Sequence, residues 1–105
     1  MPLAYALQRT TMKVPNATRA RHIQPTDLKS KAIGAAVAEF RRAAGFSQER
    51  LSADCGFERT YLSRVERGIL NPTAIRVWTI ADALKVPFRE LVGRMETWAL
   101  EQGRR

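Results

Sequence analysis

Hydrogen-bonding side chains recur at helical spacing between residues 58 and 67. At about 100° per residue, a helix over this segment places them on one side and leaves Tyr61, Leu62 and Val65 on the other. The polar side consists of Arg59, Thr60, Ser63, Arg64 and Arg67. Arginine can donate two hydrogen bonds to guanine in a DNA major groove, and threonine can bond to a base or contact a thymine methyl. The segment could therefore read base edges, although an ordinary solvated helix face has a similar composition.

Residues that could catalyse a reaction or bind a metal are few and scattered. His22 is the only histidine and Cys55 the only cysteine, and neither has the convergent partners that a metal or catalytic site needs. One cysteine cannot form an intrachain disulfide, so Cys55 is interpreted as a small packing residue in a reducing compartment. We therefore expect no enzyme, no metal and no cofactor.

The composition fits one small basic domain. The 105 residues include 18 Lys and Arg against 10 Asp and Glu. The resulting net charge of +8 favours a polyanionic partner, but it does not distinguish nucleic acid from a membrane surface. No apolar run approaches the ~20 residues of a membrane span, and the first residues do not form a signal peptide. The sequence predicts a cytoplasmic protein with no membrane partner.

Two helices are expected before the polar segment, which forms a third. The first ends at Gly45 and has one apolar face, which consists of Ile33, Val37, Phe40 and Ala44. Ser47 is a suitable N-cap for a second helix over about 48–54. Gly56 breaks this helix before the third begins, over 58–67.

Two further helices are expected after the polar segment. A fourth, over 74–84, offers five residues to the core: Val77, Trp78, Ile80, Ala81 and Leu84. A fifth begins at Pro87 and continues the apolar stripe with Phe88, Leu91, Val92, Met95 and Trp98. Gly93 could bend or end it. No stretch shows the alternation of a strand, so the predicted fold class is all-α with five helices.

The chain is expected to divide into three parts. These are a basic N-terminal arm at 1–26, a helical domain at 27–95, and a C-terminal tail at 96–105 that could extend the fifth helix. Residues 1–31 contain six basic residues and one acid, whereas 47–68 contain four of each. The charge therefore lies mainly in residues 1–31, which include the arm. The arm could follow phosphates, enter a minor groove or bind a protein partner.

The segment 47–68 reads SQERLSADCGFERTYLSRVERG, and it resembles the Cro/CI-type (XRE-like) helix-turn-helix DNA-binding family. The matching residues include Gln48 beside the N-cap, Gly56 in the turn, Leu62-Ser63 inside the third helix and Glu66-Arg67-Gly68 at its end. The resemblance covers about residues 33–92. It implies a compact five-helix, repressor-type helix-turn-helix domain whose third helix enters the major groove.

The resemblance also implies a role for individual residues. Base contacts are expected from Arg59, Thr60, Ser63 and Arg64. Phosphate contacts are expected from Gln48, Tyr61, Arg67 and Asn71. Arg41 and Glu66 occupy the positions of a structural ion pair that holds the third helix against the first.

The sequence departs from the family pattern at two positions. Ser52 stands where the family more often has alanine, and serine costs little there if its hydroxyl bonds back to its own helix. Glu58 stands at an N-cap that the family usually fills with Ser or Thr. Glutamate caps less well, although its charge favours a helix start.

The apolar stripe of the fifth helix is longer than a core of this size needs. Its residues Phe88, Leu91, Val92, Met95 and Trp98 are therefore interpreted as a homodimer interface, with packing inside the fold as the alternative. A twofold dimer would place two reading helices about 34 Å apart, one duplex turn, and so predicts a palindromic operator.

We therefore expect a sequence-specific regulator of transcription that binds duplex DNA and acts as a repressor by occlusion. The segment 58–63 and the short chain also resemble controller proteins of restriction-modification systems. An alternative from another class is an antitoxin that binds a toxin protein and autoregulates its operon.

Overall fold

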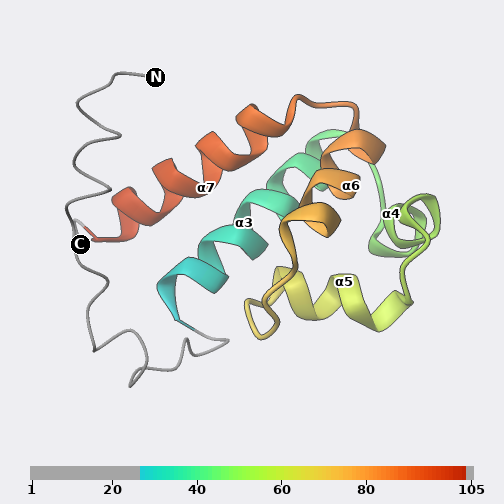
Figure 1. Ribbon diagram of the computed structural model, residues 1–105, viewed down its shortest axis with the longest axis horizontal. Helices are drawn as coiled ribbons and strands as arrows, with labels where there is room; N and C mark the ends of the chain where they lie inside the picture. The colour runs from blue at the N-terminus through green and yellow to red at the C-terminus, as the bar shows by residue number, and fades with distance from the viewer. Residues whose placement is uncertain (1–26, 104–105) are drawn as a thin grey trace, which may run out of the picture.

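The computed structural model describes residues 27–103, which form five α-helices (Figure 1). The helices are α3 (Leu28–Ala43), α4 (Gln48–Cys55), α5 (Arg59–Glu66), α6 (Ala74–Leu84) and α7 (Phe88–Gly103). No strand occurs within these residues, and the predicted all-α fold with five helices is confirmed. The predicted basic arm, at 1–26, lies outside the described residues.

Side-chain caps begin three of the helices. Asp27, Ser47 and Thr73 each accept a hydrogen bond from the backbone N–H three residues further on, at 3.0, 3.0 and 3.2 Å. Such a cap satisfies one of the N–H groups that a helix start leaves without a helical partner. Glu58 occupies the N-cap of α5 without a side-chain hydrogen bond. Only its charge therefore supports the start of α5, through the helix dipole.

The core lies around α3, which contacts α5, α6 and α7 (Figure 1). All five helices contribute to the buried cluster, which consists of Ala36, Val37, Leu51, Leu62, Val77, Ile80, Ala81, Leu84 and Leu91. Each fully buried leucine or isoleucine contributes about 1.5–3 kcal/mol. Ile33 and Phe40 pack against this cluster, as their spacing predicts. Ala44 does not, because α3 ends before it and leaves it exposed as the C-cap.

The prediction that Trp78 lies in the core is wrong, since its side chain is 53% exposed. The buried residues of α6 span a narrow arc, and Trp78 lies about 100° around the helix from Val77, outside that arc. Its ring stacks on Phe88 instead, with the centroids 4.4 Å apart and the planes 4° from parallel. The stack joins α6 to the first turn of α7.

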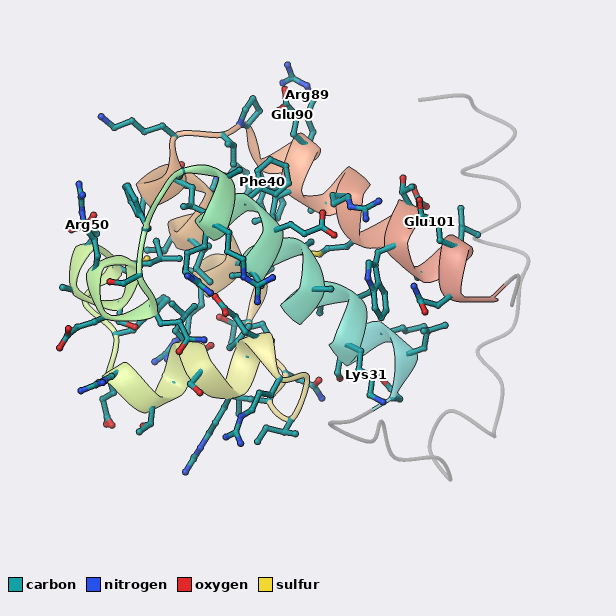
Figure 2. All side chains as sticks on the ribbon, turned by 180° about the vertical axis from the view of Figure 1, so that it is seen from behind. Lys31, Phe40, Arg50, Arg89, Glu90 and Glu101 are labelled. Atoms are coloured by element: carbon teal, nitrogen blue, oxygen red, sulfur yellow. The ribbon has the colours of Figure 1, made fainter. Side chains whose placement is uncertain are left out.

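α7 runs antiparallel to α3 and packs along it (Figure 1). It continues through Gly93 to Gly103, so Gly93 does not end the helix. Arg94 of α7 donates to both carboxylate oxygens of Glu39 in α3, at 2.7 and 2.9 Å. These hydrogen bonds hold the pKa of Glu39 below its usual value. Phe40 lies beside this pair, on the side of α3 that faces α7 (Figure 2).

α3 and α5 approach each other closely at Gly34. A Cβ added to Gly34 would lie 2.6 Å from the backbone carbonyl oxygen of Glu66, and it would also overlap the carbonyl oxygen of Val65. Only a residue without a Cβ permits this packing. Gly34 therefore sets how deeply the end of α5 sits on α3.

Ser52 is buried in α4, with 2% of its surface exposed, and its hydroxyl has no hydrogen-bond partner in the described part of the chain. The Ser52 hydroxyl therefore does not make the hydrogen bond to its own helix that would limit the destabilisation by serine at this position. A buried hydroxyl without a partner lowers stability by about 1–3 kcal/mol. Ser52→Ala is expected to raise the free energy of unfolding by about 1 kcal/mol in urea denaturation.

Ser47→Ala is the matched control for this substitution. It should lower the free energy of unfolding by about 1 kcal/mol, because the Ser47 hydroxyl caps α4. A loss of stability in Ser52→Ala would contradict the assignment of an unsatisfied hydroxyl.

Residues with metal-binding or redox chemistry do not gather anywhere between 27 and 103. These residues include no group of three or more His, Cys, Asp or Glu that could hold a metal ion. Cys55 is half-buried against the core, and burial raises the pKa of its thiol to about 11. The thiol is therefore protonated at neutral pH. None of the five helices is long and apolar enough to cross a membrane.

Candidate nucleic-acid interface

Two short helices and a tight turn form the centre of the candidate interface. α4 ends at Gly56, whose φ of 72° lies in the left-handed region that glycine adopts without strain. The Phe57 N–H then donates to the Ser52 carbonyl at 2.9 Å and closes the turn. α5 follows almost at once, so the turn fixes the direction in which α5 leaves α4 (Figure 1).

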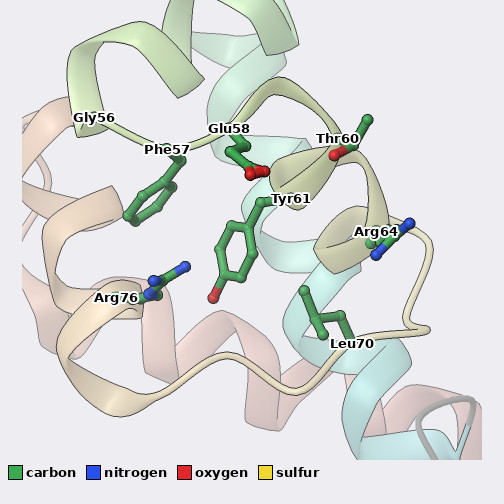
Figure 3. Close-up of a pocket in the computed structure, with 8 residues that line it drawn as sticks. All are labelled: Gly56, Phe57, Glu58, Thr60, Tyr61, Arg64, Leu70 and Arg76. Carbon is green, nitrogen blue, oxygen red and sulfur yellow. The ribbon is translucent and has the colours of Figure 1, made fainter.

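α5 separates apolar and polar side chains onto opposite faces. Leu62 and Val65 are 0% exposed and lie in the core. The polar face, called the reading face below, consists of the exposed Arg59, Thr60, Arg64 and Arg67 and the half-buried Ser63. Figure 3 shows Thr60 and Arg64 extending outward from α5. Since the opposite face is anchored in the core, the reading face is held toward the outside of the fold.

Arg59 lies 3.8 Å from the carboxylate of Glu49 in α4. Both side chains are more than two-thirds exposed, and a surface pair of this length contributes little to stability. Arg59 therefore keeps its capacity to donate hydrogen bonds to another acceptor.

The α4 flank of α5 is held by a buried ion pair. Arg41 of α3 donates to both carboxylate oxygens of Glu66, at 2.6 and 3.0 Å, and to the Phe46 carbonyl at 2.7 Å. The side chains of Arg41 and Glu66 are 11% and 5% exposed. Gln48, for which a phosphate contact is predicted, donates to the same carboxylate at 2.8 Å. One N–H of the Gln48 amide is thus used inside the fold, and the amide keeps a second N–H for a phosphate.

Asn71 is exposed in the loop between α5 and α6, and its side-chain oxygen accepts a hydrogen bond from the buried Ser30 hydroxyl of α3. This bond fixes the loop to the first turn of α3. The amide nitrogen of Asn71 carries two further donors, so its predicted phosphate contact is compatible with its position.

The other flank of α5 contains a groove that the sequence did not predict. The Tyr61 and Phe57 rings meet edge to face, with centroids 5.0 Å apart. The Arg76 guanidinium of α6 lies 4.5 Å from the centre of the Tyr61 ring, and these residues border the groove (Figure 3). The sequence pattern assigns Arg76 no role; a basic residue in the first turn of a helix, where it opposes the helix dipole, is the one signal in the sequence that could have marked it.

The predicted dimer residues of α7 do not share one environment. Leu91 is fully buried in the core and cannot contact a partner chain, so this part of the prediction is wrong. Phe88, Met95 and Trp98 are half-buried, and Val92 is exposed. The reason is that α7 packs on both α3 and α6, which cover the side of the helix on which Leu91 lies.

Two short helices are joined here by a glycine turn. The second helix is anchored by one face and presents arginine, threonine and serine on the other. This arrangement defines a helix-turn-helix domain of the DNA-binding type. The model of the helix-turn-helix family HTH_3 matches residues 37–91, which is more than half of the chain. The chain belongs to this family.

Individual relatives agree with this assignment. The chain is 45% identical over 62 residues to y4dJ of Sinorhizobium fredii, described as an uncharacterized HTH-type transcriptional regulator, across 59% of this chain and 80% of the relative. The crystal structure of C.AhdI, a restriction-modification controller protein from Aeromonas hydrophila, is similar with a TM-score of 0.57 and 37% identity. That match covers 59% of this chain and 94% of C.AhdI.

The fold is also shared with a more distant protein. ClgR, a clp gene regulator from Corynebacterium glutamicum, superposes with a TM-score of 0.68 over 75% of this chain and 85% of ClgR. The identity of 24% supports a common fold and no more.

Proposed function

We propose that this protein is a sequence-specific regulator of transcription that binds a palindromic operator as a homodimer and represses by occlusion. The reading face of α5 carries the proposal, because it presents donors for base edges while Leu62 and Val65 fix the opposite face in the core. An α-helix fits the major groove, where each base pair has a distinct pattern of donors and acceptors. The likeness to C.AhdI further supports a regulator of the controller type.

Homodimerisation is proposed to use an apolar surface formed by Trp78, Phe88 and Val92. Trp78 and Phe88 are stacked, and Phe88 and Val92 lie one turn apart on α7. The surface continues into a groove of about 280 Å³ between α3 and α7, lined by Lys29, Ala32, Ile33, Val92, Met95, Glu96 and Ala99. A second copy of the chain related by a twofold axis would cover this surface and present a second reading face.

Val92→Glu is expected to weaken the dimer tenfold or more, because it places a charge in the centre of an apolar interface. Sedimentation equilibrium of the full chain would measure this as a shift toward the monomer mass. Leu100→Glu is the matched control, since Leu100 is an exposed apolar residue of the same helix that does not line the groove. Equal dimerisation of both variants would place the interface elsewhere.

Selection from random duplexes, followed by affinity measurements against salt, tests the function as a whole. A palindromic consensus with half-sites one duplex turn apart is expected. Binding without sequence preference would contradict the proposal.

Arg64→Ala is expected to lower affinity for the selected duplex by about 1–3 kcal/mol for each half-site and to relax the preference at one base position of each half-site. Arg89→Ala, which removes an exposed arginine from the first turn of α7, is the control and should leave the consensus unchanged. An unchanged consensus in Arg64→Ala would mean that Arg64 does not read a base.

A further inference from the structure

A groove of about 260 Å³ opens beside the reading face, on the flank of α5 that faces α6 (Figure 3). It is lined by Gly56, Phe57, Glu58, Thr60, Tyr61, Arg64, Leu70 and Arg76. Two of these residues, Thr60 and Arg64, belong to the reading face. Arg76 comes from a different helix, and neither the sequence pattern nor the family resemblance assigns it a role. The groove is therefore continuous with the proposed DNA surface but extends it onto α6.

Arg76 is held in place by aromatic rings and not by a carboxylate. Its guanidinium carbon lies 4.5 Å from the centre of the Tyr61 ring and 5.3 Å from that of Phe57. No acidic side chain of residues 27–103 pairs with it within 4.0 Å. A guanidinium held over ring faces keeps the donors in its own plane for other acceptors, and its position costs little additional entropy on binding. Arg76 is thus an exposed cation whose guanidinium makes no hydrogen bond to any other residue of the described range 27–103.

The charges of the groove favour an anion. Arg64 of α5 and Arg76 of α6 both line it, and Glu58 is the one acid among the lining residues. The guanidinium fork matches the oxygens of a phosphate group in a bidentate manner. The apolar part of the lining suits the sugar that joins successive phosphates.

The position of the groove indicates which DNA strand it would face if α5 lay in the major groove. A helix in the major groove has one DNA strand along each wall. Gln48 and the Arg41–Glu66 pair lie on the α4 flank of α5, whereas Tyr61 and Arg76 lie on the α6 flank. The two flanks therefore face opposite strands.

We propose that Arg76, supported by the Tyr61 and Phe57 rings, binds a backbone phosphate of the DNA strand opposite to the one beside Gln48. This inference rests on the proposed function. Arg76 then fixes the register of α5 in the groove from the α6 side, and it contributes the same affinity on every sequence, because phosphates carry no sequence information.

Binding of the selected duplex and of a scrambled duplex, each across a range of salt concentrations, tests this assignment. Arg76→Gln is expected to weaken binding of both duplexes about tenfold for each protomer. It should reduce the slope of log K against log salt by about two for the dimer, about one for each lost phosphate contact. The consensus should not change. Arg89→Gln removes the same charge from an exposed position of α7 and should leave the slope unchanged.

Glu58→Gln, measured in the same way, is expected to change the affinity in the opposite direction to Arg76→Gln. Removal of the one carboxylate in the groove should strengthen binding of both duplexes severalfold, because it removes repulsion from the phosphate. The lost support of the α5 N-terminus by the Glu58 charge is measured separately, as a lower melting temperature. An unchanged salt slope in Arg76→Gln would overturn the proposal, as would a changed consensus, since either would exclude a phosphate contact. Failure of the wild-type chain to prefer any duplex would contradict the proposed function itself.

Discussion

Replacement of Glu66 with alanine is expected to lower the free energy of unfolding by about 3–5 kcal/mol, a large part of the stability of a domain of this size. The Arg41 guanidinium makes two hydrogen bonds to Glu66, and its side chain is 11% exposed. Without the carboxylate, this cation stays in a site from which water is largely excluded. Thermal or urea denaturation followed by circular dichroism measures the loss.

Two variants separate the charge from the packing around it. Glu66→Gln keeps the shape and one acceptor, so it should destabilise less than Glu66→Ala. Arg41→Met combined with Glu66→Leu removes both charges, and it should recover most of the lost stability because no charge remains buried. An unchanged melting temperature in Glu66→Ala would show that the pair does not hold α5 to α3.

Gly34→Ala is expected to be the most damaging exchange of one small residue for another, at about 3 kcal/mol or more. The added methyl would lie within 2.6 Å of the Glu66 carbonyl oxygen. That atom belongs to the backbone, so no side-chain rotation relieves the clash, and α5 must move away from α3. We therefore expect DNA affinity to fall together with the melting temperature.

Gly93→Ala is the matched control. Gly93 lies inside α7, and nothing approaches a Cβ built at that position within 4 Å. Alanine is the better helix former by about 1 kcal/mol, so Gly93→Ala should raise the melting temperature. If Gly34→Ala were as stable as the wild type, α3 and α5 could not pack as closely as their backbones indicate.

The helices and the reading face are the part of this protein that local sequence could predict. The N-cap at Ser47, the glycine at 56 and the apolar pair Leu62 and Val65 act within a few residues, and the structure has the helices where they indicate. The spacing of polar residues over 59–67 is a property of one helix. It can therefore be predicted without knowing which helices pack beside it.

Local sequence could not predict whether a given apolar side chain is buried or exposed, because this depends on which helices pack together. The sequence pattern assigns Trp78 to the core and Leu91 to a dimer interface, whereas the structure exposes half of Trp78 and buries Leu91 completely. Helical periodicity finds an apolar stripe, but only the neighbouring helices determine which part of the stripe they cover. The environment of the Ser52 hydroxyl also depends on tertiary packing, which buries it without a hydrogen-bond partner among the described residues.

The sequence by itself therefore determined that five helices form and that one of them presents a polar face of arginines, threonine and serine. Tertiary structure alone decided how that face is supported and extended, through the contact of Gly34 with α5 and the placement of Arg76 over Tyr61. The physical reason is one of range. Caps, turns and amphipathic spacing act between residues that are neighbours in the chain, whereas close packing and charge placement join residues that only the folded chain brings together.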